Sequence, residues 1–177
     1  MTRIRNYIWL LSGLLGALLL TGCIVVGTFV IDYEFASNDG FDGLAQFDID
    51  LTEEEDWNDH KDKIKNIDNV GFVLKATNHD DDAVDVEMYI DSIEAPYYLD
   101  AGDVIANTVK ILDDVTFAAS GVTTIDWPTS LSKVKNVSTL KNYAESGVFR
   151  IYIVSDQSSV DVTIDFGVVV VTVTAGK

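Results

Sequence analysis

The sequence has little cysteine, proline, histidine or basic residue: one cysteine, two prolines, two histidines and 12 lysines and arginines among 177 residues. A single cysteine cannot pair within the chain, which excludes a disulfide framework. The 29 aspartates and glutamates give a formal net charge of −17. Binding to nucleic acid needs arrays of basic residues, and electrostatic adhesion to anionic lipid needs basic clusters. The charge balance therefore argues against both, and is explained by solubility or by cation binding.

Sequence motifs of common enzyme classes are also missing. The chain contains no G-x-S-x-G nucleophile turn, no phosphate-binding glycine loop and no H-E-x-x-H zinc motif. Pairs of carboxylates occur throughout so acidic a chain, so no pair stands out as a general acid and base. We therefore expect a protein without catalytic activity, and we keep an enzyme as a third hypothesis.

The N-terminal segment is first basic and then apolar. No acidic residue precedes Asp32, Arg3 and Arg5 lie near the start, and an apolar run extends from Ile8 to Leu20. A short basic region, an apolar core of roughly 7–15 residues and then small residues are typical of a secretory signal. The small residues follow here, directly before the only cysteine.

The residues Leu20-Thr21-Gly22-Cys23 resemble the lipobox of bacterial lipoproteins, in which a leucine, two small residues and a cysteine close the signal. The resemblance implies cleavage between Gly22 and Cys23 and a thioether-linked diacylglycerol on Cys23. It divides the chain into a signal peptide over 1–22 and a single folded domain over 23–177. Acyl chains then hold the protein at a membrane, since each buried CH₂ contributes about 0.8 kcal/mol.

Two other interpretations of this segment stay open. The stretch from Ile8 to Ile31 carries no charge and is long enough to span a bilayer of about 30 Å, as an uncleaved anchor would. Cys23 could also be a core cysteine of a cytosolic protein. Against an anchor, residues 24–31 are rich in β-branched side chains, which favour a strand that begins directly after the cysteine.

Position 24 bears on the destination of a lipoprotein. By resemblance to enterobacterial lipoproteins, an aspartate after the cysteine would favour retention in the inner membrane, and this chain has Ile24 there. We therefore expect a lipid-anchored protein of the cell envelope. Where the host has two membranes, the outer membrane is preferred over the inner one.

Alternating apolar and polar residues predict that most of the remaining chain forms strands. The expected strands cover 28–36, 45–51, 104–118, 121–127, 148–154 and 160–174, and the clearest unit is a β-hairpin over 69–93. A capping box at Thr52 and Glu55 predicts a helix over 53–62, and an apolar stripe predicts another over 129–146. About eight strands with one or two covering helices indicate a mainly antiparallel β-sandwich. As a whole, the chain resembles bacterial lipoproteins with such a body.

The loop His79-Asp80-Asp81-Asp82 is the first candidate site, because carboxylate oxygens bind hard cations such as Ca²⁺. It lacks the spacing of calcium loops, in which alternating acids precede a glycine and a distant glutamate. The alternative is that consecutive aspartates simply keep a hairpin tip in water. Three other pairs are candidates for cation binding: Asp48 and Asp50, Asp39 and Asp42, and Asp56 and His60.

Four aromatic residues form a second candidate site, a platform for a ligand: Trp57, Tyr97, Tyr98 and Trp127. Packing in the core is the competing explanation, because large aromatic side chains are mostly buried in a domain of this size.

Two binding hypotheses follow from these patterns. The first is a lipid-anchored envelope protein that acts as a non-catalytic binding or assembly module for a protein or glycan partner, without a cofactor. The second is a Ca²⁺-dependent adhesion or carbohydrate-binding module. The first requires only the anchor at Cys23, whereas the second also requires a cation at 79–82.

Overall fold

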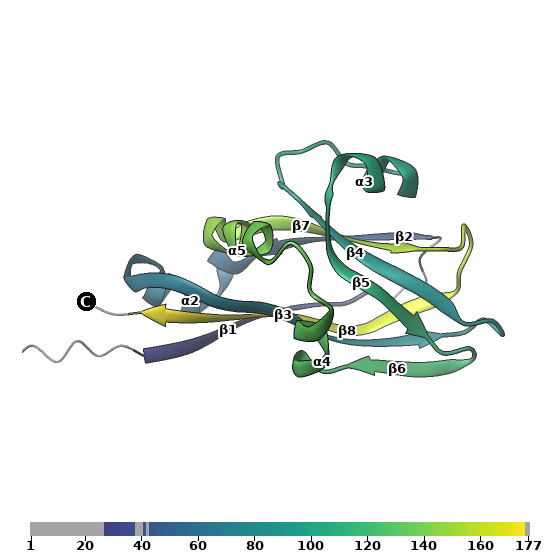
Figure 1. The fold of residues 1–177 in the computed structure, drawn as a ribbon, viewed down its shortest axis with the longest axis horizontal. Helices are drawn as coiled ribbons and strands as arrows, with labels where there is room; N and C mark the ends of the chain where they lie inside the picture. The colour runs from purple at the N-terminus through teal and green to yellow at the C-terminus, as the bar shows by residue number, and fades with distance from the viewer. Residues whose placement is uncertain (1–26, 38–40, 42, 176–177) are drawn as a thin grey trace, which may run out of the picture.

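The computed structural model describes residues 27–37, 41 and 43–175, which form two four-stranded antiparallel sheets (Figure 1). The first sheet has the order β1-β8-β3-β6 and the second β2-β7-β4-β5. The strands are β1 (Gly27–Phe35), β2 (Leu44–Asp50), β3 (Ile64–Asn78), β4 (Val84–Asp91), β5 (Val109–Phe117), β6 (Gly121–Ile125), β7 (Val148–Ser155) and β8 (Val162–Ala175). The helices and 3₁₀ turns are η1 (Leu51–Glu53), α2 (Glu55–His60), η2 (Lys61–Lys63), α3 (Ala101–Asn107), α4 (Trp127–Lys133) and α5 (Val137–Ser146). The predicted β-sandwich is confirmed.

The core lies between the two sheets and follows from the alternation of side chains along each strand. Successive residues of a strand point to opposite faces. Val70, Phe72 and Leu74 of β3 are therefore all buried, and so are Ile49 of β2 and Ile151 of β7 in the other sheet. Each such side chain contributes roughly 1.5–3 kcal/mol relative to an exposed one.

The predicted hairpin over 69–93 is wrong. β3 pairs with β8 and β6, whereas β4 pairs with β5 and β7, so the two strands lie in different sheets. Apolar and polar residues alternate along both strands because each strand has one apolar face on the shared core. The two strands approach that core from opposite sides. The loop 79–83 crosses from one sheet to the other at one end of the sandwich (Figure 1).

Two of the expected elements near the second sheet are corrected. The helix expected over 53–62 is the short α2 between the 3₁₀ turns η1 and η2. The side chain of Asp50 caps η1, and the helix α2 has no side-chain cap, so the capping box at Thr52 does not form. Residues 104–107 of the strand expected over 104–118 belong to α3, which the sequence did not predict.

The helix expected over 129–146 is two helices, α4 and α5. Val134 forms an isolated bridge with Leu112 of β5, and Asn136 takes a left-handed backbone with a φ of 48°. These two positions interrupt the helical hydrogen bonds although the apolar stripe continues through them. Trp127, expected at the end of a strand, starts α4.

α4 covers the edge of β3 where β6 ends. Pairing between β3 and β6 begins at Leu74, and before it the N–H of Phe72 donates instead to Ser130 Oγ of α4 at 2.9 Å. Gly71 permits this approach, since a Cβ there would lie 2.9 Å from both Ser130 Oγ and Trp127 Nε1. Uncovered strand edges invite pairing with other chains, and the helix prevents it here.

β1 begins where β8 ends. Gly27 and Ile64, the first residues of β1 and β3, both pair with Ala175 of β8 from opposite sides. Figure 1 shows these strand ends together at the left end of the molecule. Within the described residues, no helix is long and apolar enough to cross a membrane.

Candidate functional site

One arginine is buried in a strand that is otherwise mostly apolar. The strand β7 reads VFRIYIVS, and its Arg150 is only 1% exposed. Phe149 and Ile151 belong to the core, so Arg150 projects from the outer face of the second sheet. A buried guanidinium is costly unless its donors find acceptors, and its partners therefore define the first polar region.

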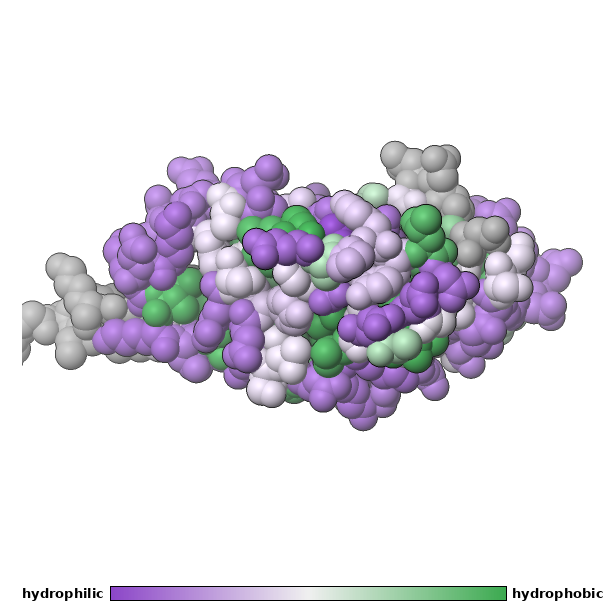
Figure 2. All heavy atoms as spheres, turned by 90° about the horizontal axis from the view of Figure 1, so that it is seen from above, coloured by the Kyte–Doolittle hydropathy of each residue, from purple (hydrophilic) through white to green (hydrophobic). Residues whose placement is uncertain are grey.

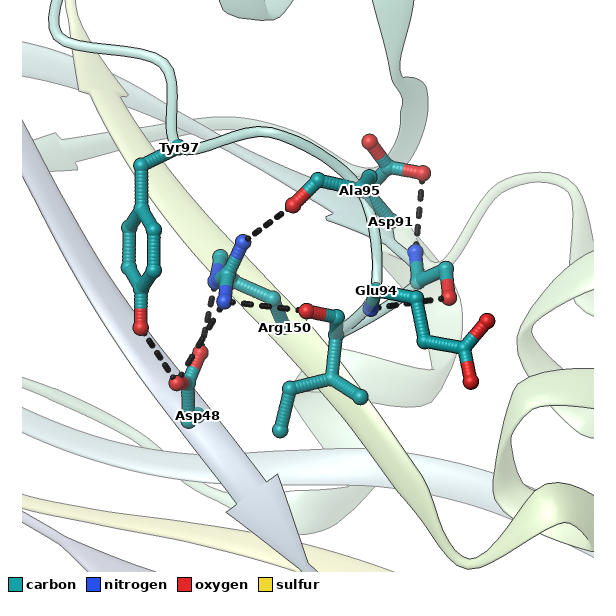
Figure 3. A network of polar contacts seen from close by, with 8 residues as sticks. Asp48, Asp91, Glu94, Ala95, Tyr97 and Arg150 are labelled. Carbon is teal, nitrogen blue, oxygen red and sulfur yellow. Dashed lines mark hydrogen bonds and ion pairs between the residues drawn. The ribbon is translucent and has the colours of Figure 1, made fainter.

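The guanidinium of Arg150 is enclosed by the strand β2 and by the segment that follows β4 (Figure 3). Its Nε donates to Oδ1 of Asp48, the paired residue on β2, at 2.6 Å. Its Nη1 donates to the carbonyl of Ala95 at 3.1 Å, and its Nη2 to the carbonyl of Ile93 at 3.3 Å. The ring of Tyr97 stacks on it, with 3.6 Å from Cζ to the ring centroid, and the Tyr97 hydroxyl donates to Asp48 Oδ2 at 2.8 Å. We call Arg150, Asp48 and Tyr97 the arginine network.

The charges of the arginine network are fixed across the neutral pH range. The hydrogen bond from Arg150 lowers the pKa of Asp48, and the hydrogen bond from Tyr97 acts in the same direction, against a contribution from partial burial. The hydrogen bond to Asp48 raises the pKa of Tyr97. The network therefore acts as a permanent structural tie and not as an acid or a base.

The arginine network holds the segment 92–97, which follows β4, in place. Two carbonyls of this segment accept from Arg150, and its own turn is closed by the N–H of Glu94, which donates to Ser92 Oγ at 3.2 Å. The carboxylate of Glu94 points away from Arg150 (Figure 3). One side of the segment is thus fixed against the sheet, and the other side is left for α5.

A groove of about 640 Å³ separates this segment from α5. The groove residues of α5 are spaced i, i+3, i+4 and i+7 and so lie on one face of the helix. The lining consists of Ser92, Ile93, Glu94, Thr139, Asn142, Tyr143, Ser146 and Val148. Leu140 and Ala144, on the other face of α5, are buried and fix the helix to the core. We call this hollow the α5 groove.

Part of the hydrogen-bonding capacity of the α5 groove is unused. The Ser146 hydroxyl lies 2.6 Å from the carbonyl oxygen of Tyr143, and burial with the nearby Asp91 raises the pKa of Tyr143. The carboxylate of Glu94, the hydroxyl of Thr139 and the amide of Asn142 have no partner within the part of the chain that the structure describes. These three groups are available to a ligand.

Figure 2 shows the side of the molecule that carries α3 and α5, seen from above Figure 1. Polar residues cover most of it, and apolar residues form small separate groups among them. Two large apolar side chains near and in α3, Leu99 and Ile105, are 87% and 52% exposed. The surface is mixed in character, and the α5 groove, which polar and apolar side chains line together, fits that pattern.

A second hollow, of about 310 Å³, has acidic walls. Asp85, Glu87, Asp114 and Asp156 line it together with Ile105, Val154 and Ser155. Burial alone would raise the pKa of Glu87, but hydrogen bonds from Lys110 and Tyr89 lower it, while the hydrogen bond with Glu87 raises the pKa of Asp114. Among the residues that the structure describes, no three His, Cys, Asp or Glu side chains gather closely enough to hold a metal ion.

The predicted cation loop 79–82 joins neighbouring loops. The carboxylate of Asp80 accepts from the N–H of Asp161 at 2.7 Å, and that of Asp81 accepts from the Ser120 hydroxyl at 3.1 Å. His79 Nε2 lies 3.2 Å from Thr163 Oγ1. Two of the three carboxylates therefore tie loops together at this end of the sandwich, and cation binding at His79, Asp80, Asp81 and Asp82 stays a prediction.

The other predicted sites are not brought together. Cys23, Gly22, Asp39 and Asp42 lie outside the described residues. The carboxylates of Asp48 and Asp50 are engaged with Arg150 and with Thr52, and His60 Nδ1 contacts the backbone oxygen of Asp56 at 2.8 Å. Of the four aromatic residues, Trp57 is buried, Tyr98 and Trp127 are half-buried, and only Tyr97 is exposed. Core packing, the competing explanation, therefore holds for Trp57, while the ring of Tyr97 stacks on Arg150.

Sequence reasoning missed Arg150 and the α5 groove. A lone arginine in the apolar run of β7 was the available signal, but its partner Asp48 lies 102 positions away and is found only through the strand register. The apolar stripe over 129–146 predicts only a helix that covers the core, and it does not mark a groove on the outer side of that helix. Their opposite wall, at 92–94, could not be placed without the fold.

Comparisons with known proteins add little about function. No protein-family model matches the sequence, and no curated protein matches it. A structure of Desmodium yellow mottle tymovirus covers 86% of this chain and 89% of its own, at 5% identity and a TM-score of 0.37. The CBM36-1 domain of a multidomain xylanase from the hindgut metagenome of Trinervitermes trinervoides covers 81% of this chain and 96% of its own, at 12% identity and a TM-score of 0.35. A structure of turnip yellow mosaic virus covers 86% of this chain and 82% of its own, at 6% identity and a TM-score of 0.34. At such TM-scores these structures carry no argument about function.

Proposed function

We propose that this protein is a lipid-anchored module of the cell envelope that binds a partner without catalysing a reaction. The observation that carries the anchor is the sequence Leu20-Thr21-Gly22-Cys23, which ends four residues before β1 begins at Gly27. Only residues 24–26 separate the cysteine from the sandwich. A strand that starts so soon after Cys23 supports a mature domain that begins at the cysteine, and Ile24 supports delivery to the outer membrane.

The α5 groove is the proposed binding surface. Its volume of about 640 Å³ lies in the range of roughly 300–1,000 Å³ that ligand pockets occupy. One wall is a helix packed on the core and the other is held by Arg150, so little ordering entropy is lost on binding. The unused groups of Glu94, Thr139 and Asn142 suit a partner that both donates and accepts hydrogen bonds.

Metabolic labelling with palmitate in a bacterial host tests the anchor. We expect label in the wild-type protein and none in Cys23→Ala, which should also keep its signal and migrate as the larger precursor. Ser12→Ala, inside the apolar run, is the matched control and should be labelled normally. Label that survives Cys23→Ala would defeat the assignment.

Site-specific photo-crosslinking tests the groove. A photoreactive amino acid at Asn142 or Thr139 should give a discrete adduct in intact cells, because both side chains line the groove. The same amino acid at Val122, which is 56% exposed on β6, is the control and should give none. Equal adducts at all three positions would count against the groove.

A carbohydrate-binding module is the second candidate function. The observation in its favour is the lining of the groove by hydroxyl, amide and carboxylate groups, which match the hydrogen-bonding pattern of sugar hydroxyls. In the Ca²⁺-dependent version, millimolar Ca²⁺ should raise the melting temperature and a chelator should lower it. No shift in either direction would rule out that version and leave Ca²⁺-independent binding to be measured by titration with oligosaccharides.

A further inference from the structure

The strand β1 ends the first sheet, and among the described residues it pairs with β8 alone (Figure 1). Four strands end a sheet, and β1 and β5 are the longest of them, with nine residues each. The edge of β5 is covered, because Leu112 forms a bridge with Val134 and the N–H of Lys135 donates to the carbonyl of Ile111. An open strand edge is a template for pairing with another chain, and β1 provides one.

The free backbone groups of β1 follow from the strand register. Successive residues of an antiparallel strand direct their N–H and C=O groups to alternate sides. The N–H of Ser37 donates to the carbonyl of Ile164, so the groups of the odd-numbered residues of β1 face β8. The N–H of Phe72, which points away from β8 to α4, gives the same assignment through the registers of β3 and β8. The backbone groups that point outward belong to Thr28, Val30, Asp32 and Glu34.

A hollow of about 470 Å³ lies along the second half of this edge. Its lining consists of Asp32, Tyr33 and Glu34 from β1 and of Glu53 and Glu54 at the end of η1. None of these four carboxylates has a hydrogen-bond or ion-pair partner within the described part of the chain. The first half of the edge, from Gly27 to Ile31, carries no charge. The edge therefore has an uncharged half and an acidic half.

The charges around this hollow are negative. Burial and the charges of Glu53, Asp50 and Glu54 raise the pKa of Tyr33. The two strands on this side, β1 and β8, contain no lysine or arginine. The lysines that follow α2 line a different hollow. A segment that pairs with β1 therefore meets unpaired carboxylates, and a basic segment is the one that they attract.

We propose that the free edge of β1 binds an extended segment of another protein that carries lysines or arginines on alternate residues. Such a segment adds a strand to the sheet through main-chain hydrogen bonds, and its basic side chains lie beside Asp32 and Glu34. A second copy of this chain fits less well, because it would bring the same carboxylates to the edge and has a net charge of −17. This surface is separate from the α5 groove and does not depend on the anchor at Cys23.

Titration of the full-length protein with synthetic peptides, in a neutral detergent, tests the proposal. The probe is a fluorescent peptide of alternating lysine and valine with nine residues, the length of β1. One control peptide has glutamate in place of lysine. The other keeps the lysines but is N-methylated at its central residues, so that it cannot donate strand hydrogen bonds. We expect each control to bind at least about ten-fold more weakly, which one or two hydrogen bonds or a few ion pairs account for.

Hydrogen–deuterium exchange locates the bound probe, and Val30→Pro tests the edge itself. With the probe bound, amides of 28–34 should exchange more slowly, whereas those of the edge strand β6 should not change. The N–H of Val30 points outward and is not used by the sheet, and proline is tolerated at such edge positions. Val30→Pro should therefore keep the circular dichroism spectrum of the wild type and lose at least about ten-fold in affinity for the probe.

A double variant tests the acidic hollow without changing the backbone. Glu53→Gln with Glu54→Gln should weaken binding of the probe about five-fold, the effect of two exposed ion pairs. Asp82→Asn with Asp103→Asn removes the same charge from exposed positions elsewhere and is the matched control, which should bind the probe as the wild type does. This comparison also decides the case in which Val30→Pro does not fold.

Four results would overturn the inference. The first is a probe that does not bind, and the second is an N-methylated control that binds equally well, which would reduce the contact to charge alone. The third is protection of β6 in place of β1. The fourth is a dimer of the chain that dissociates in Val30→Pro, because it would assign the edge to a second copy.

Discussion

The arginine network and the α5 groove share the segment 92–97 but use their polar groups in opposite ways. In the network the guanidinium of Arg150 is fully enclosed, and its donors meet a carboxylate and two carbonyls. In the groove, the side chains of Glu94, Thr139 and Asn142 have no partner within the described part of the chain. The nitrogen atoms of Arg150 already donate hydrogen bonds within the protein, so a ligand could bind them only if those bonds broke. The network therefore serves stability, whereas the groove is the surface that we propose for binding.

The largest effect should come from Asp48→Ala. The substitution leaves the guanidinium of Arg150 buried without its counter-charge. We expect a loss of about 2–4 kcal/mol in the free energy of unfolding, somewhat below that of a fully buried pair because water reaches the Asp48 carboxylate. Urea denaturation measures it, with Asp32→Ala as the control for removing an exposed acid. A loss no larger than that of the control would show that the pair does not stabilise the fold.

Arg150→Met should cost less, about 1–3 kcal/mol, because it removes the buried charge together with its donors. Its particular consequence is local. The carbonyls of Ile93 and Ala95 lose their donors, so the amides of 92–97 should exchange faster with solvent than in Asp48→Ala. If Arg150→Met destabilises more than Asp48→Ala does, the hydrogen bonds from Arg150 to the carbonyls of Ile93 and Ala95 outweigh the loss of its counter-charge.

The alternation of apolar and polar residues along each strand could be recognised in the sequence, but the assignment of strands to sheets could not. Residues 64–78 and 84–91 each show one apolar face, and that pattern is the same whether two strands pair or face each other across a core. Loop length did not decide it either, since five residues can close a hairpin or cross between sheets. Pairing depends on contacts with β8 and β7, which come later in the chain.

The sequence-based predictions of helices and of polar sites were wrong or incomplete for related reasons. α3 has one buried residue, Val104, and so gives almost no periodic signal. The stripe over 129–146 is continuous in sequence, but the left-handed Asn136 divides it. The polar groups that matter most, those of Arg150 and Asp48, become neighbours only through the register of β2 and β7. The local sequence pattern predicts which face of a strand or helix is apolar, whereas the polar sites depend on strand pairing between residues far apart in the sequence.

Acid should weaken the arginine network. The hydrogen bond from Arg150 lowers the pKa of Asp48 in the folded state below its unfolded value, so its stabilisation is complete above about pH 4 and is lost as the pH falls through the folded pKa. In Asp48→Asn this contribution is missing at every pH. The difference in unfolding free energy between wild type and Asp48→Asn should therefore shrink between pH 5 and pH 2, about the range in which such a carboxylate takes up its proton. A constant difference would mean that Asp48 does not titrate with folding.

The smallest effect on stability should come from Asn142→Ala in the α5 groove. The Asn142 amide is exposed and has no partner among the described residues, so its loss should change the free energy of unfolding by less than about 0.5 kcal/mol. Binding should respond in the opposite way, because a ligand that uses the amide loses a hydrogen bond and leaves its own group unpaired. Gln46→Ala, which removes an exposed amide of β2 that has no partner among the described residues, is the matched control for stability and binding. A variant at 142 that keeps the full crosslinking or titration signal would show that the free groups of the groove are ordinary hydrated surface, and the contrast with the arginine network would then be one of burial alone.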